Sequence, residues 1–160
     1  MLDESVPEAL LHDRLYDGYS KPSTYPSHKP MNSSDADATP FEQIGGQLAV
    51  DRIIDLFYDR MDTLPEAGII RVLHPQDLGA TRAVLKRYLA EWLGGPRAYS
   101  EERGHPRLRA RHLPFSIGDE ERDAWMLCMR SAMEDVVTDV AIREWILEKL
   151  SGVATWMRNR

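Results

Sequence analysis

Apolar residues recur at the spacing of an amphipathic helix in four segments of this chain, and all four lie after residue 40. The first segment follows Gly45-Gly46. Its apolar face consists of Val50, Ile53, Ile54, Phe57, Tyr58 and Met61. The second runs from about Leu78 to Leu93 and stops at Gly94-Gly95-Pro96, which is a strong C-terminal signal for a helix. Its face consists of Thr81, Leu85, Tyr88, Leu89 and Trp92.

The third helical segment is predicted to open at Ser116, three residues before Asp119, as in a capping box. The side chains that it is expected to bury are Trp125, Cys128, Met129, Ala132 and Val136. The fourth extends from about Val140 to Met157 and aligns Ile142, Trp145, Ile146, Leu150, Val153 and Met157. No stretch alternates with period two, so the predicted fold is all-α. Four long helices without an internal repeat indicate a bundle-like or globin-like packing.

About twenty residues separate the second and third helical segments, and prolines and glycines prevent them from forming one long helix. The helix breakers are Pro96, Gly104, Pro106 and Pro114. Pro106 can still occupy the first turn of a very short helix that reaches about His112. The sequence therefore predicts one or two helical turns suspended between two packed helices.

Residues 1–40 differ in composition from the rest of the chain. They hold five of the ten prolines, six serines, and seven acidic against three basic residues. This composition is typical of an extension that is flexible or partly helical, and the spacing of Val6, Leu10, Leu11 and Leu15 suits a short helix. The predicted organisation is an N-terminal extension at 1–40 and a single domain at 41–160.

Length and charge limit the classes of function. A chain of 160 residues with 42% hydrophobic residues suits one domain. Its single cysteine, Cys128, excludes an intrachain disulfide, and there is neither a membrane-length apolar run nor a cationic signal peptide. A net charge of -6 argues against nucleic-acid binding. We therefore expect a cytoplasmic protein with no nucleic-acid or membrane partner.

The candidate chemistry lies in the segment from Gly104 to His112, which contains two histidines and three arginines. Seven helical residues advance about 10.5 Å, too far for His105 and His112 to bind one metal ion at about 2.0 to 2.1 Å each. Neither HExxH, CxxC nor a nucleophile elbow is present. One imidazole beside an apolar pocket suits haem, whose propionates require cations. A purely structural histidine remains the alternative at this point.

A set of short motifs, taken in their order along the chain, favours the haem site over the structural histidine. The motifs are Gly45-Gly46, Phe57-Tyr58, Gly94-Gly95-Pro96, Tyr99, the segment from Gly104 to His112, Pro114-Phe115, the segment from Glu121 to Trp125, and Cys128-Met129. Over about residues 41–158 the chain resembles the group II truncated haemoglobins. The resemblance implies a two-over-two helical sandwich of the truncated globin type, in which the proline-broken connector is the proximal loop.

The same resemblance implies a haem b site and assigns roles to its residues. His112 would be the proximal ligand of the iron. Trp125, Tyr58 and His74 would be hydrogen-bond donors in the distal pocket, and Thr81 stands where full-length globins carry a distal histidine. Arg111 and then Arg109 are expected to bind the propionates. The remaining residues of the predicted haem-binding set are Tyr99, Lys86, Leu85, Thr81 and Phe115.

Three distal donors predict slow release of O2, which suits redox chemistry better than oxygen transport. The expected ligands are O2, NO, CO or peroxide, and the expected reactions are nitric oxide detoxification or peroxide-linked turnover supported by a reductase. Two alternatives stay open. One is a ligand-binding or sensing module whose N-terminal tail docks a partner, and the other is a helical interaction protein that has lost haem. A homodimer is also compatible with the sequence.

Overall fold

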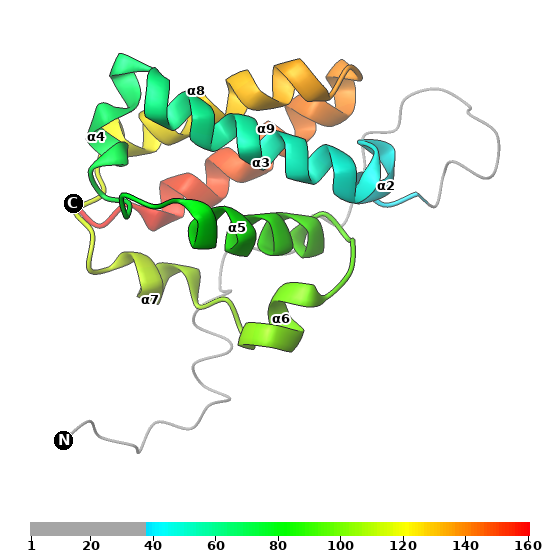
Figure 1. Cartoon of the computed structure of the whole chain (residues 1–160), viewed down its shortest axis with the longest axis horizontal. Helices are drawn as coiled ribbons and strands as arrows, with labels where there is room; N and C mark the ends of the chain where they lie inside the picture. Colours follow the sequence, from blue (N-terminus) through cyan, green and yellow to red (C-terminus); the bar gives the residue numbers. More distant parts are fainter. Residues whose placement is uncertain (1–37) are drawn as a thin grey trace.

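Four long helices dominate the computed structural model, which describes residues 38–160 (Figure 1). They are α3 (Gly46–Thr63), α5 (Gly79–Trp92), α8 (Asp119–Val136) and α9 (Val140–Met157). The described part of the chain contains no strand, so the predicted all-α fold is confirmed. The predicted bounds of α9 agree with the structure. The helix suggested between Val6 and Leu15 lies outside the described residues.

The long helices pack against one another in the order α5, α3, α8, α9. Helix α3 packs against both α5 and α8, and α8 packs in turn against α9. The core residues Ile53, Phe57, Met129 and Ile146 are fully buried at these contacts. Burial of a large apolar side chain stabilises the fold by about 1.5 to 3 kcal/mol, so these contacts account for much of its stability. The arrangement is the expected two-over-two sandwich.

The start of α8 differs from the prediction. The helix begins at Asp119 with Gly118 as N-cap, and the Gly118 N–H donates to the Glu121 carboxylate at 2.8 Å. The predicted capping box from Ser116 is therefore wrong, because residues before Gly118 remain outside the helix. Burial also differs at two positions, since Trp125 and Val136 are only partly buried.

Short helices connect the long ones. They are α2 (Pro40–Gln43), the 3-10 helix η1 (Pro65–Ala67), α4 (Gly68–Arg71), α6 (Ala98–Arg103) and α7 (Leu108–His112). Helix α2 has a full capping box, in which Thr39 N–H donates to the Glu42 carboxylate at 2.8 Å and Glu42 N–H donates to Thr39 Oγ1 at 3.3 Å. None of the helices in residues 38–160 is long and apolar enough to cross a membrane.

Two glycines end α5 as the sequence indicates. Gly94 has φ of +94°, a conformation that side chains rarely adopt. A Cβ on Gly95 would meet the Phe41 ring at 2.7 Å and the Ala90 carbonyl oxygen at 2.8 Å. The chain consequently turns sharply here and places α6 and α7 below α5 in the view of Figure 1.

Helix α7 corresponds to the predicted short helix before Leu113-Pro114. Its N-cap, Arg107, has a left-handed backbone with φ of +45°. The Arg107 N–H donates to His105 Nδ1 at 3.1 Å, so His105 supports the turn that precedes the helix. This contact agrees with a structural role for His105 in the loop.

Candidate functional site

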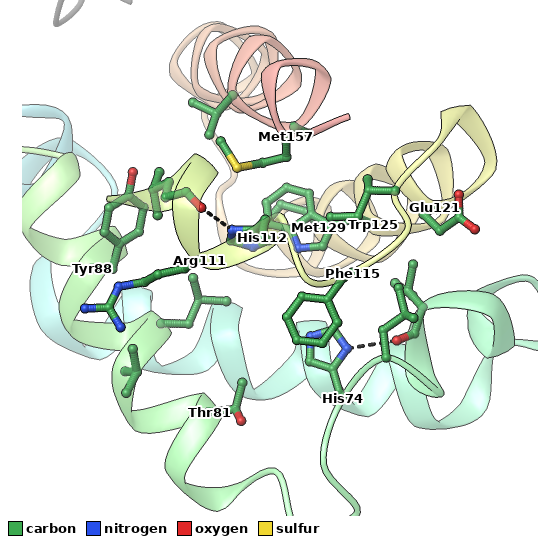
Figure 2. Close-up of a pocket in the computed structure, with 18 of the residues that line it drawn as sticks. His74, Thr81, Tyr88, Arg111, His112, Phe115, Glu121, Trp125, Met129 and Met157 are labelled. Carbon is green, nitrogen blue, oxygen red and sulfur yellow. Dashed lines mark hydrogen bonds between the residues drawn. The ribbon is translucent and has the colours of Figure 1, made fainter. Parts of the chain in front are cut away.

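A cavity of about 430 Å³ is lined by residues of α3, α5, α7, α8 and α9 and by the segment from Ile70 to Pro75. Its wall is mostly apolar, and Figure 2 shows the side chains that enter it. The apolar residues from α9 are Leu150, Val153, Ala154 and Met157. A largely apolar cavity of this size with a few polar groups is the usual form of a cofactor site.

His112 is the last residue of α7, and its ring enters the cavity (Figure 2). Its Nδ1 lies 2.6 Å from the Leu108 carbonyl oxygen, one turn earlier in the helix. Because a carbonyl oxygen can only accept, Nδ1 carries the proton, and Nε2 is the nitrogen with a lone pair in the neutral ring. This is the tautomer of a metal-binding imidazole whose second nitrogen donates to a carbonyl.

His74 lines the same cavity and makes the same local contact. Its Nδ1 lies 2.8 Å from the Ile70 carbonyl oxygen, so Nδ1 again carries the proton. Burial is the main cause that lowers the pKa of His74, and the positive charge of Arg71 lowers it further. The ring is therefore neutral at pH 7, and its Nε2 accepts hydrogen bonds instead of donating them. The predicted donor role of His74 would require the other tautomer, in which Nε2 carries the proton.

The other two predicted distal donors, the Trp125 indole N–H and the Tyr58 hydroxyl, belong to residues that line the cavity. Tyr58 is 2% exposed, and burial raises the pKa of its hydroxyl well above the ordinary value, so it stays protonated. Phe57 packs beside both rings, with centroid distances of 4.8 Å to Tyr58 and 5.2 Å to Trp125. Within residues 38–160, no side chain or carbonyl accepts a hydrogen bond from either donor.

Comparison with known proteins shows the family to which this chain belongs. The sequence model of the bacterial-like globin family matches residues 39–159. The chain is 42% identical to a group 2 truncated haemoglobin, YjbI, of Bacillus subtilis (strain 168) over 121 residues, which are 76% of this chain and 89% of that protein. The chain belongs to the group II truncated haemoglobins.

Solved structures agree with this assignment. A group II two-on-two haemoglobin from Agrobacterium tumefaciens superposes with a TM-score of 0.76 and 43% identity, over 81% of this chain and 98% of that one. A truncated oxygen-avid haemoglobin from Bacillus subtilis superposes with a TM-score of 0.70 and 41% identity, over 76% of this chain and all of that one. As a globin, the protein binds haem and, through it, O2 and similar small ligands.

The cavity of the globin fits a haem by its own chemistry. It offers the His112 and His74 imidazoles, each with Nε2 available, a mainly apolar wall, and a guanidinium at its edge from the exposed Arg111. Arg111 Nε donates to the Pro106 carbonyl oxygen at 2.9 Å, which orients the side chain beside Tyr88 in Figure 2. Four further predicted haem-contacting residues line the cavity, namely Thr81, Leu85, Tyr99 and Phe115.

Two predicted propionate-binding residues lie elsewhere in the globin. Arg109 does not line the cavity, because its guanidinium donates to the Trp156 carbonyl oxygen and, at 3.2 Å, to that of Arg158 at the end of α9. Lys86 does not line it either, because its Nζ pairs with the Asp55 carboxylate of α3 at 2.9 Å. The structure thus assigns Arg109 and Lys86 to contacts between helices.

The sequence prediction missed part of the wall and its supports. The periodicity predicts only a helix face for Tyr88, yet it lines the cavity and makes an edge contact with Tyr99 at a centroid distance of 5.5 Å. Glu121 and Asn159 were given no role. Helical periodicity signalled Tyr88 and the α9 residues of the wall, whereas Asn159 carries no signal of its own, since its partners lie more than 40 residues away.

Proposed function

We propose that this globin holds haem b through His112 Nε2 and uses bound O2 to oxidise nitric oxide to nitrate. A ferrous haem supplies the iron that binds O2 and carries the reaction. The overall change joins NO, O2 and one electron into nitrate, so a reductase must return one electron after each turnover. We assign that step to a separate reductase protein.

The pair of donors without acceptors supports the proposal. Trp125 and Tyr58 present an N–H and an O–H in a mostly apolar cavity. Preorganised donors in such a cavity stabilise developing negative charge better than they do in water. Their effect is to retain O2, because release would leave both donors without a partner again. A protein that retains O2 is suited to consuming it at the site.

His74 contributes differently from the two donors. Its neutral Nε2 is an acceptor near the Tyr58 ring, with ring centroids 6.0 Å apart. An acceptor at this place can orient a hydroxyl or a water, but it cannot add a third hydrogen bond to O2. The distal set for the proposed reaction therefore consists of two donors and one acceptor.

The test mixes the oxygenated protein with nitric oxide while a chemical reductant and a generic flavin reductase are present. We expect several equivalents of nitrate per haem. A protein that yields at most one equivalent under these conditions is an oxygen-binding globin without turnover, which would defeat the proposal.

A matched pair of histidine variants controls for haem binding. H112A is expected to lose the intense Soret band of the purified protein, whereas H74A is expected to keep it. If H112A retains the band and its nitrate yield, His112 is not the iron ligand.

A further inference from the structure

The end of the chain pairs with the segment that joins α7 to α8. The Asn159 backbone N–H donates to the Ile117 carbonyl oxygen at 2.9 Å, and the Ile117 N–H donates back to Asn159 Oδ1 at 3.0 Å. Figure 1 shows the C-terminus beside this connecting segment. The pairing keeps residues before α8 extended, which is why the helix does not begin at Ser116.

The Asn159 side-chain amide extends this contact to His112. Its Nδ2 donates to the Phe115 carbonyl oxygen at 2.7 Å and to the His112 carbonyl oxygen at 3.3 Å. The His112 oxygen also accepts the Phe115 N–H at 3.0 Å, which closes a turn over residues 112–115. Both the amide nitrogen and the oxygen of one carboxamide are therefore bound to the segment that follows the proposed iron ligand.

Ion pairs fix the residues on either side of Asn159. Arg158 pairs with Asp119 and Arg160 pairs with Glu121, and both carboxylates belong to the first turn of α8. The Arg160 guanidinium, followed by the Gly118 N–H, holds the pKa of Glu121 below its ordinary value. The terminal residues are thus attached to α8 by charge as well as to the loop by hydrogen bonds.

Helix α7 needs such support because it is short. A helix of five residues has few internal hydrogen bonds and is marginal alone. Leu113, directly after His112, is 58% exposed and adds little packing. The position of His112 consequently depends on contacts with distant parts of the chain.

We propose that Asn159 is a positioning residue for the iron ligand. It holds the His112 carbonyl group and the turn after it, and so fixes the direction in which the imidazole enters the cavity. The inference rests on the proposed role of His112 as the axial ligand. The same positioning preserves the bond of 2.6 Å from His112 Nδ1 to Leu108, which makes the imidazole a stronger ligand.

Two variants and one control test this role in the full-length holoprotein. N159A removes the carboxamide, whereas N159D keeps its size and the acceptor for Ile117 but places a carboxylate against two carbonyl oxygens. Q43A is the matched control, because Gln43 Nε2 also donates to a backbone carbonyl oxygen, that of Ala38, at 2.7 Å. Helix α2, to which Gln43 belongs, lies at the opposite side of Figure 1 from the C-terminus.

The measurements are the iron–histidine stretching band of the ferrous, ligand-free protein and the rate of haem transfer to excess apomyoglobin. We expect both Asn159 variants to shift the band to lower frequency, because a displaced imidazole loses part of its Leu108 bond. We also expect haem loss about tenfold faster, equivalent to about 1.4 kcal/mol. Q43A should leave both quantities at the parent values.

An unchanged band in folded N159A or N159D overturns the proposal, even if the melting temperature falls, since that result shows a merely stabilising residue. If N159A does not fold, an unchanged band in N159D overturns the proposal and a band shifted to lower frequency supports it. The H112A variant separates this outcome from failure of the proposed function. If H112A keeps the parent band, His112 is not the ligand, and the positioning role falls with it.

Discussion

Replacement of Trp125 by phenylalanine isolates one hydrogen bond in the distal cavity. The change removes the indole N–H but keeps an aromatic ring beside Phe57, whose centroid lies 5.2 Å from that of Trp125. Tyr58 remains as the second donor. Because no group in residues 38–160 accepts the Trp125 N–H, no internal bond is broken by the substitution.

The expected magnitude follows from the type of bond. O2 takes up negative charge on a ferrous haem, and a hydrogen bond to a charged partner contributes about 1.5 to 3 kcal/mol. At about 1.4 kcal/mol per factor of ten, the loss of one such bond should speed O2 dissociation by about tenfold to a hundredfold. CO takes up much less charge, so its dissociation should change far less.

The assay mixes oxygenated protein rapidly with excess CO and follows the Soret band. The control is W92F, because Trp92 packs against the core from the last turn of α5 and does not line the cavity. An O2 dissociation rate in W125F within twofold of the parent would refute the role of Trp125. Equal acceleration for O2 and CO would also refute it, since that pattern indicates a widened cavity instead of a lost bond.

Three further predictions concern the support of the site. Asp139 caps α9 by accepting the Ala141 N–H at 2.8 Å, so D139A should lower the free energy of unfolding by about 1 kcal/mol, as measured by urea titration. The pKa of Glu121 is lowered in the folded state, so its contribution to stability is present above the ordinary value of 4.5 and is lost as the pH falls through the folded value. E121Q should therefore lose less stability than the parent between pH 7 and pH 4 in urea unfolding, and an equal loss would exclude this contribution. R111A should release haem faster than the parent, while R109A should mainly lower the melting temperature, because Arg111 lines the cavity and Arg109 does not. Haem transfer and thermal unfolding measure the two effects. If R109A instead releases haem faster and R111A instead lowers the melting temperature, the two assignments are reversed.

Periodicity predicted the long helices well because their faces are apolar over many turns. The predicted bounds of α9 match its observed span, and those of α5 differ by one residue at each end. Short helices such as α6 (Ala98–Arg103) escaped prediction because six residues carry too little periodicity. The start of α8 was predicted wrongly at Ser116 because the pairing of Ile117 with Asn159, across 42 residues, leaves no trace in local sequence.

The arginines between positions 107 and 111 are a second case in which local sequence does not determine the contacts. Three arginines within five positions look equivalent in sequence, yet Arg109 and Arg111 point to different partners. Arg109 reaches carbonyl oxygens at the C-terminus of α9, where a cation is favoured by the helix dipole. The direction of each guanidinium depends on how α7 is rotated against α9, and composition does not determine that rotation.

The two cavity histidines make the same local hydrogen bond, although different roles are proposed for them. His74 and His112 both donate Nδ1–H to the carbonyl oxygen four residues earlier, so each leaves Nε2 as the nitrogen available to the same cavity. Local hydrogen bonding therefore does not distinguish the proposed iron ligand from its neighbour. The distinction comes from what surrounds each ring, since His74 adjoins the buried Tyr58, whereas His112 precedes a turn that Asn159 holds from the end of the chain. A ligand to iron must be fixed against displacement when small molecules bind and leave, and of the two rings only His112 has that long-range support among the described residues.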